Sequence, residues 1–212
     1  MIELFKHILH LDFEWLFAQY GTMVYLILFL VIFIETGVVL MPFLPGDSLL
    51  FTAGLFARMG YLDLSSLMIL LFIAAVAGDN TNYFIGKNIG LKVMQYKIKN
   101  RNLVKQEYID KTHEFYEKYG PKTVIIARFV PIVRTFAPFI AGVAEMKYRV
   151  FLLYNVVGGA IWILSLTLAG YFLGNIQLIR DNIEKVAILI VLLSVLPIVF
   201  ELVKSKKIKQ AK

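Results

Sequence analysis

Four stretches of this chain are long and apolar enough to cross a lipid bilayer, and no other feature restricts its fold as strongly. A bilayer core is about 30 Å thick, so a spanning helix needs about 20 apolar residues. Residues 22–41, 64–86, 150–174 and 184–203 reach that length. Hydrophobic residues make up 59% of the 212 positions, which is more than a soluble domain carries. We therefore predict an all-α integral membrane protein with about four transmembrane helices.

Two further apolar segments are interrupted by proline and cannot form clean lipid-facing helices. Pro45 lies in the first of them and Pro131 in the second. Backbone that proline frees at membrane depth must be buried in protein or line a water-filled cavity. These segments therefore predict two re-entrant helical hairpins, near 42–60 and 122–145.

The two hairpins carry a weak internal repeat. FTAGLFARMGY at 51–61 matches FIAGVAEMKY at 139–148, with Phe-x-Ala-Gly in register. FIGKNIG at 84–90 matches LAGYFLG at 168–174, and both contain Gly-x-x-x-Gly, a spacing that permits close helix packing. Broken elements at corresponding positions of inverted halves indicate a transporter with its site near the bilayer midplane. We predict that the hairpins are opposed in such an inverted repeat.

The basic residues predict the orientation in the membrane. The net charge of +7 is concentrated in the segment after the second span and in the lysine-rich tail. Lys and Arg in short loops favour the cytoplasmic side, so we expect both termini in the cytoplasm and no nucleic-acid partner. The predicted organisation is an interfacial amphipathic helix at 1–20, a membrane domain at 21–175, and a last transmembrane helix with a basic tail at 176–212.

Five charged residues lie inside the apolar segments and away from their ends, where ionisable groups are costly and usually functional. They are Glu35, Asp47, Asp79, Arg128 and Arg134. Structural explanations remain open: Glu35 and Asp47 could be solvated at the interface, Asp79 could cap a helix, and the arginines could simply pair with the acids. We favour function for the arginines, because the guanidinium fork suits bidentate phosphate binding.

Several neighbouring residues are candidates for supporting this site. Asp79, Tyr83 and Lys87 follow at four-residue steps, so they share one helix face, which we expect to look into the bundle. Lys87 alone could also be explained by snorkelling to the interface. The other supporting candidates are the hairpin residues Pro45, Gly46 and Pro131.

Enzymatic chemistry and metal binding are not expected. The chain has no cysteine, and its three histidines lie outside the apolar segments. A lipid phosphatase in a membrane usually needs a histidine pair or a metal site, and the acids show no compact metal-ligand spacing. We expect no cofactor and no catalytic residue.

These motifs resemble the DedA family of membrane proteins, whose eukaryotic relatives carry the VTT domain. The resemblance covers roughly residues 20 to 175 and rests on Glu35 and on four motifs. The motifs are MPFLPGDSLLFTAG, AGDNTNYFIGKNIG, ARFVPIVRTFAPFIAGVAEM and NVVGGAIW. It implies facing re-entrant hairpins and lipid handling that depends on the proton-motive force. It also implies that acids at Glu35 and Asp47 and arginines at Arg128 and Arg134 are required, while Lys87 stands where relatives often carry Arg.

The expected function is therefore a flippase of the cytoplasmic membrane that moves a phosphate-bearing lipid, undecaprenyl or another polyprenyl phosphate. Arg128 and Arg134 are expected to bind the phosphate, and Glu35 and Asp47 to carry the coupling protons. The alternatives are a phospholipid translocase, for instance for phosphatidylethanolamine, and a proton or cation antiporter without a lipid substrate. A scaffold whose polar residues only hold the hairpins together is a further alternative. The lipid, the coupling ion, the direction of transport and a homo-oligomeric state stay open at this point.

Overall fold

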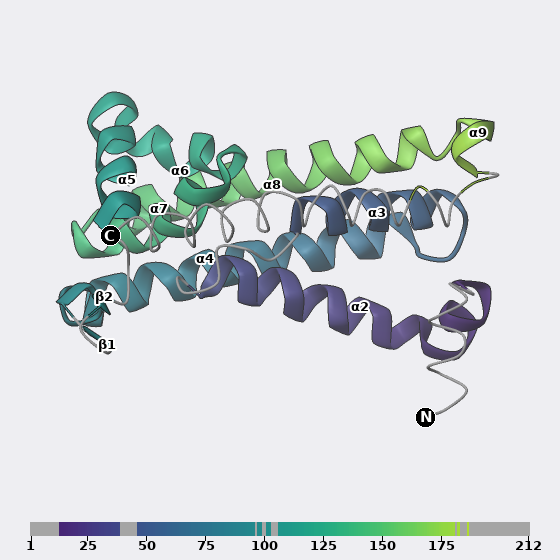
Figure 1. The fold of residues 1–212 in the computed structure, drawn as a ribbon. Helices are drawn as coiled ribbons and strands as arrows, with labels where there is room; N and C mark the ends of the chain where they lie inside the picture. The colour runs from purple at the N-terminus through teal and green to yellow at the C-terminus, as the bar shows by residue number, and fades with distance from the viewer. Residues whose placement is uncertain are drawn as a thin grey trace, which may run out of the picture. The chain divides into compact units, whose positions relative to one another are not determined.

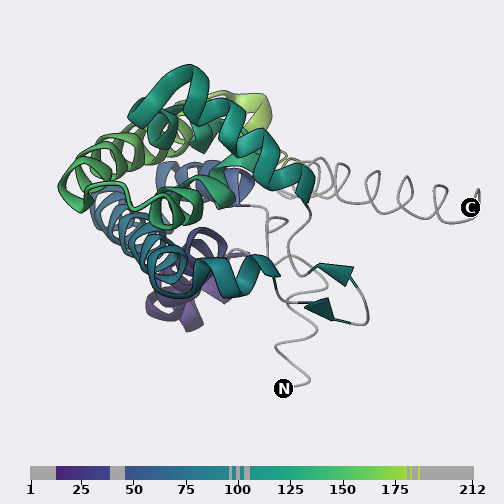
Figure 2. The ribbon, with the colours of Figure 1, turned by 90° about the vertical axis from the view of Figure 1, so that its left-hand side faces the viewer.

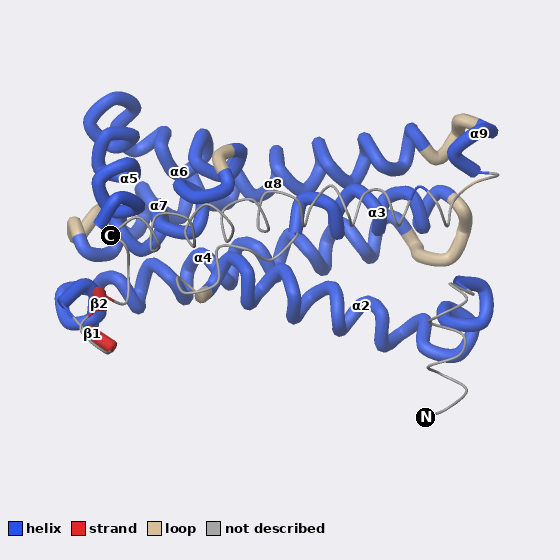
Figure 3. The backbone as a smooth tube through the Cα atoms, viewed as in Figure 1, coloured by secondary structure: helices blue, strands red, loops and turns tan. Residues whose placement is uncertain are grey.

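A computed structural model gives the fold of the chain. It describes residues 13–38, 46–95, 97–98, 101–102, 106–180, 182 and 186. Figure 3 shows that the described chain is helical, which confirms the predicted all-α class. A small difference is the antiparallel pair of two-residue strands β1 and β2.

The elements follow one another along the chain as labelled in Figure 1. They are α2 (Phe13–Gly37), α3 (Gly46–Arg58), α4 (Leu64–Gln95), β1 (Lys97–Ile98), β2 (Arg101–Asn102), α5 (Gln106–Tyr119), the 3₁₀ turn η1 (Gly120–Lys122), α6 (Thr123–Ile126), the 3₁₀ turn η2 (Ala127–Phe129), α7 (Pro131–Val143), α8 (Tyr148–Leu173) and α9 (Gln177–Arg180).

Three of the described helices are long and apolar enough to cross a membrane. They correspond to Gln19–Gly37, Leu64–Gly90 and Tyr148–Leu173. Three of the four predicted spans are therefore confirmed as apolar helices of membrane-spanning length, although the first ends earlier than expected. The fourth predicted span, 184–203, lies outside the described residues apart from position 186.

Helix α2 is kinked near its start. Tyr20 has non-helical dihedral angles, with φ −124° and ψ 15°. The kink falls at the boundary between the predicted interfacial segment 1–20 and the first span. Residues 1–12 of that segment lie outside the described residues, so the interfacial helix stays a prediction.

The chain forms two compact units. The first takes its described residues from within 1–25, 45–67 and 166–212, and the second from within 26–44 and 68–165. In the first unit, α3 packs on the end of α8 through glycines. A Cβ on Gly54 would clash with the backbone carbonyl of Thr167, and one on Gly170 would clash with that of Phe51.

The second unit contains the same type of packing between α7 and α4. A Cβ on Gly142 would clash with the backbone carbonyl of Tyr83, and one on Gly86 would clash with that of Phe139. Phe139 and Gly142 occupy the positions of Phe51 and Gly54 in the sequence repeat. The repeat is therefore matched by equivalent helix packing, and the predicted role of the Gly-x-x-x-Gly steps is confirmed.

The second proline-rich segment is broken at one place only within the described residues. Val130 is extended, with φ −119° and ψ 105°, and separates η2 from α7. The residue before a proline is disfavoured in the helical conformation, and Pro131 then begins α7 in a position where its missing N–H costs nothing. Pro138 lies inside α7 and does not end it. Arg128 lies just before this break, in η2, and Arg134 lies one helical turn after it, in α7.

Helix α5 packs on the hairpin that this break creates. It makes its main contacts with α7, as Figures 1 and 2 illustrate. The Tyr116 hydroxyl donates to the Ala137 carbonyl at 2.9 Å. Burial, and secondarily the negative charge of Asp79, raise the pKa of the Tyr116 phenol, so it remains a neutral donor. This contact attaches the polar helix α5 to the apolar helix α7.

The glycine packing predicts an unusual response to alanine. Alanine normally stabilises a helix by about 1 kcal/mol over glycine. At Gly86 its methyl group would collide with the Phe139 carbonyl, so we expect Gly86→Ala to destabilise by about 1–3 kcal/mol. Gly21→Ala is the matched control, because nothing lies within 4 Å of a Cβ at that helical glycine. Thermal unfolding of both variants in detergent tests this, and an unchanged or raised midpoint for Gly86→Ala would contradict it.

Candidate functional site

The second unit buries a group of polar side chains among its apolar helices. Burying such groups is unfavourable unless they are paired, and it marks a site when it occurs within membrane-length helices. Gly78 brings α2 and α4 together here, since a Cβ on it would meet Phe33 and Thr36 of α2. The buried polar residues of this group are Glu35, Thr36, Asp79, Asn82, Arg128, Thr135 and Asn155.

Arg128 is paired with Asp79. The guanidinium Nη2 forms an ion pair and hydrogen bond with the Asp79 carboxylate, and both side chains are at most 5% exposed. The same Nη2 donates to the Asn155 side-chain oxygen at 2.5 Å. Arg128 Nε is buried and has no hydrogen-bond partner among the described residues. Arg128 therefore uses only part of its donor fork on the protein contacts described here.

Asn155 is held in one orientation. Its amide nitrogen donates to the Val76 carbonyl on α4 at 3.2 Å, while its oxygen accepts from Arg128. A guanidinium can only donate and a carbonyl can only accept, so the amide cannot be flipped. Asn155 thus connects α4, α8 and the hairpin.

Two glycines of α8 make room for Arg128. A Cβ on Gly158 would lie 3.2 Å from Arg128 Nε and 3.1 Å from the Ile125 Cα. A Cβ on Gly159 would lie 3.5 Å from Arg128 Nη2. The first contact is tighter than packing normally allows, so a larger residue at Gly158 would displace the guanidinium or the hairpin.

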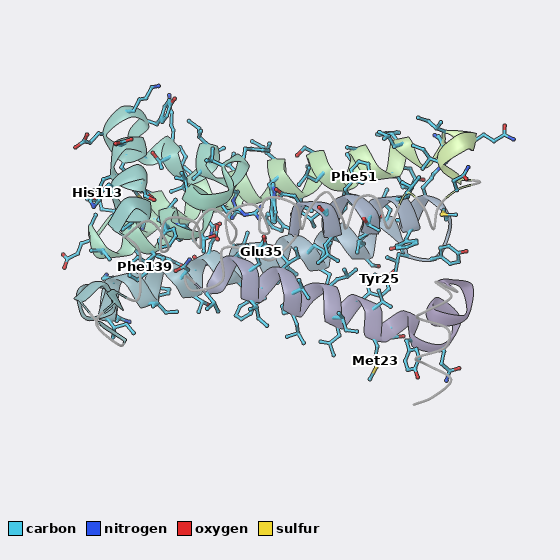
Figure 4. The ribbon with its side chains drawn as sticks, in the orientation of Figure 1. Met23, Tyr25, Glu35, Phe51, His113 and Phe139 are labelled. Carbon is cyan, nitrogen blue, oxygen red and sulfur yellow. The ribbon has the colours of Figure 1, made fainter. Side chains whose placement is uncertain are left out.

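Arg134 is paired with Glu35. Its Nη2 forms an ion pair and hydrogen bond with Glu35 Oε1, and the Glu35 side chain is only 1% exposed. Figure 4 shows Glu35 projecting from α2. The two arginines are thereby neutralised by acids from two different helices, α2 and α4.

Trp162 of α8 contacts both arginines. Its ring centroid lies 5.7 Å from Arg128 Cζ and 5.3 Å from Arg134 Cζ. Both distances are within the range of cation–π attraction, and the residue is 1% exposed. One indole therefore joins the two arginine–carboxylate pairs into a single site.

Asn82 connects α2 and α7 next to these pairs. Its amide nitrogen donates to the carbonyls of Thr36, at 3.1 Å, and Thr135, at 2.8 Å. The Asn82 amide oxygen and the Thr135 hydroxyl are buried without a hydrogen-bond partner among the described residues. These groups add hydrogen-bonding capacity that the described part of the chain does not use.

Comparison with known proteins identifies the family of the chain. Residues 44–172 match the VTT domain family. The chain is 49% identical over 208 residues to the protein DedA of Escherichia coli (strain K12), covering 96% of this chain and 94% of DedA.

The chain belongs to the DedA family of membrane proteins.

Two other membrane proteins are also similar. A membrane protein of Mycobacterium leprae (strain TN) is 46% identical over 167 residues, which cover 79% of this chain and 74% of that protein. The inner membrane protein YqjA of Escherichia coli (strain K12) is 32% identical over 184 residues, with coverage of 86% and 82%. No solved structure shows significant similarity to the chain.

Four of the predicted site residues of this DedA family chain come together in the second unit. Glu35, Asp79, Arg128 and Arg134 form the two ion pairs around Trp162. The alternative in which Glu35 is solvated at the interface is wrong, because its side chain is buried among the helices of the second unit. The alternative in which Asp79 caps a helix is also wrong, because it lies in the middle of α4.

The other predicted residues are placed differently. Tyr83 is buried, stacks on Phe151 with ring centroids 4.5 Å apart, and donates its hydroxyl to the Met146 carbonyl. Lys87 is exposed, so the expected interior face holds for Asp79 and Tyr83 but not for Lys87. Asp47 lies partly buried in the first turn of α3, in the first unit.

Two of the remaining candidates, Gly46 and Pro131, stand at the first positions of helices. Gly46 begins α3 and is buried, and Pro131 begins α7. Pro45 lies outside the described residues.

Sequence reasoning missed several polar partners. Asn155 and Trp162 were visible in the motif NVVGGAIW, whose spacing places them on one face of a helix. Asn82 and Thr135 had no distinguishing signal, because asparagine and threonine are common in polar loops and helix ends alike.

The Arg128–Asp79 pair predicts an asymmetric mutational response. Removing one partner of a buried ion pair leaves an uncompensated charge and costs about 3–5 kcal/mol. We therefore expect Asp79→Asn to destabilise strongly, and the double variant Asp79→Asn/Arg128→Gln to recover most of that loss. Glu117→Gln, at an exposed acid on α5, serves as the control. Detergent unfolding midpoints measure all three, and additive losses in the double variant would contradict the pairing.

Proposed function

We propose that this DedA family protein is a transporter linked to the proton-motive force, which moves a phosphate-bearing lipid across the cytoplasmic membrane. The observation that carries the proposal is the pair of buried arginines, each neutralised by a buried carboxylate and both in contact with Trp162. Undecaprenyl or another polyprenyl phosphate is the substrate we favour, with its prenyl chain left in the lipid.

The chemistry of arginine supports a phosphate ligand. A guanidinium presents planar donors that match phosphate oxygens, and such charge-assisted bonds are stronger than neutral ones. Arg128 keeps a buried Nε donor with no partner among the described residues, and Thr135 keeps its hydroxyl. A phosphate between Arg128 and Arg134 would use these groups.

Exchange at Arg134 supports proton coupling. The Glu35 carboxylate and a phosphate are both anions, so they compete for the same guanidinium. A proton on Glu35 removes its charge and weakens its hold on Arg134, which favours phosphate binding, and loss of that proton restores the ion pair and favours release. Proton and lipid binding then favour one another, which is the reciprocal linkage that coupling needs. Asp47 is proposed to carry a proton in the first unit.

The lengths of α3 and α7 support a re-entrant arrangement. Each helix has 13 residues, a rise of roughly 20 Å against a bilayer core of about 30 Å. We therefore propose that both belong to re-entrant hairpins of an inverted repeat, opposed across the membrane as in inverted-repeat transporters. In this arrangement four helices span the cytoplasmic membrane, and both termini lie in the cytoplasm.

The proposed transport involves no covalent change of the lipid. His113, the one histidine in the described residues, lies exposed on α5 (Figure 4). We propose neither an enzymatic reaction nor a cofactor. An antiporter without a lipid substrate would use the same acids and arginines, and a phospholipid translocase would use the same phosphate chemistry, so substrate tests must separate them.

Transport in proteoliposomes tests the coupling. Purified protein should move fluorescent polyprenyl phosphate faster when a proton gradient is imposed, and Glu35→Gln should remove that dependence while the protein stays folded. Lys122→Gln, at an exposed cation, is the control and should transport normally. Proton flux without lipid movement would support the antiporter, and equal movement of phosphatidylethanolamine would support the phospholipid translocase.

A charge swap separates substrate binding from simple pairing. Glu35→Arg/Arg134→Glu restores opposite charges at the pair, so we expect its thermal stability to recover relative to each single variant. Transport should stay lost, because the phosphate would then meet a carboxylate. Arg134→Lys keeps the charge but loses the fork, and we expect about tenfold weaker head-group binding from the loss of one strong hydrogen bond. Recovery of transport by the swap would assign the pair a structural role only.

Cysteine labelling tests the second hairpin. The chain contains no cysteine, so single cysteines can be introduced without removing native ones. Lys122→Cys and Lys147→Cys flank α6 to α7 at exposed positions, and both should react with an impermeant maleimide from the cytoplasmic side. Asp63→Cys, exposed before α4, should react from the opposite side. Labelling of 122 and 147 from different sides would mean that α7 crosses the bilayer.

A further inference from the structure

Trp162 contacts both arginines, but the proposed function gives it no role of its own. Its indole is buried and lies within 6 Å of both guanidinium carbons, as given above. A ring that only filled space in the core would not require two cations beside it. An aromatic face attracts cations through its quadrupole, so the ring can hold the guanidiniums in place.

Trp162 belongs to a face of α8 whose residues surround the arginines. Asn155, Gly158, Gly159 and Trp162 follow at helical spacing and share one face of α8. Asn155 binds Arg128, and the two glycines leave space for its side chain. Trp162 completes this face one turn later, where Arg134 also arrives. The motif NVVGGAIW thus provides the contacts and the space that hold the two arginines.

The proposed exchange at Arg134 creates a need for such a ring. When Glu35 is protonated, its negative charge no longer offsets the positive charge of Arg134, and two like charges near one another in a low-dielectric site repel. The attraction of an indole for a cation does not depend on any titrating group. The ring contact therefore persists in both protonation states, while the carboxylate contact does not.

We propose that Trp162 is a positioning residue of the lipid-phosphate site: its indole holds the guanidiniums of Arg128 and Arg134 in the orientation that receives the phosphate. This inference rests on the proposed function for its ligand. The orientation of the arginines by the ring can nevertheless be measured without any ligand.

Ring chemistry is tested with two substitutions and a simple phosphate amphiphile. Trp162→Phe keeps an aromatic face, and Trp162→Leu keeps apolar bulk without one. We measure the affinity of dodecyl phosphate for the purified full chain in detergent, with thermal unfolding in parallel. Leu164→Ala is the control, because Leu164 is an exposed apolar residue of the same helix. Decyl maltoside without phosphate serves as the ligand control.

The expected order separates positioning from packing. Trp162→Leu should bind about tenfold more weakly, the scale of a cation–π contact shielded from water, and Trp162→Phe should stay within about threefold of the parent. The two variants should have similar unfolding midpoints. Parent-like binding by Trp162→Leu, or equal losses in both variants, would overturn the positioning role.

A ligand-free experiment separates this inference from the transport proposal. Trp15 is the only other tryptophan, so Trp15→Phe leaves Trp162 as the sole indole emitter. In this background, Arg134→Gln and Glu35→Gln should each shift the Trp162 emission, because the charge beside the ring is removed or released. Lys122→Gln should not. If neither substitution changes the Trp162 emission, the orientation of Arg134 by the ring is overturned. If both substitutions shift the emission but the parent protein does not bind dodecyl phosphate, only the lipid-phosphate function is overturned.

Discussion

The structure of the second unit depends on the neutralisation of two arginines in a segment that lipid would otherwise exclude. An unpaired guanidinium within membrane-length helices is costly, so each arginine must be paired with a carboxylate. Arg128 finds Asp79 on α4, and Arg134 finds Glu35 on α2. The two pairs therefore join α2, α4 and the η2–α7 segment, which are far apart in the sequence, and they form only when the η2–α7 segment packs against α2 and α4.

Glycine makes that packing possible. The short helix α7 reaches α4 closely enough for backbone contact at Gly86 and Gly142, and Gly158 leaves space for Arg128. Without a hydrophobic driving force between helices in lipid, such close packing is a main source of helix association. Van der Waals packing and the buried ion pairs thus support one another: the glycines bring the backbones together, and the charges select the register.

The same arrangement explains why a structural and a transport role need not exclude one another. A carboxylate that neutralises Arg134 in one state can be replaced by a phosphate in another, because both are anions of similar hydrogen-bonding geometry. The contacts to Asn155 and Trp162 involve neutral groups, so they do not depend on which anion is bound. A site built in this way can change its anion without losing the position of its cations.

Much of this protein follows from its sequence. Apolar length fixes three described spans, and the Phe-x-Ala-Gly repeat anticipates two equivalent helix packings, because lipid constrains helix length and glycine spacing directly. The charged residues inside apolar segments, Glu35, Asp79, Arg128 and Arg134, are evident for the same reason. The partners are not: only tertiary structure decided that Arg128 pairs with Asp79 and Arg134 with Glu35, that Asn155 and Trp162 complete the site, and that Lys87 faces outward. Pairing depends on which helices meet and at what rotation, and these are set by packing between segments up to 99 positions apart, which no local pattern records.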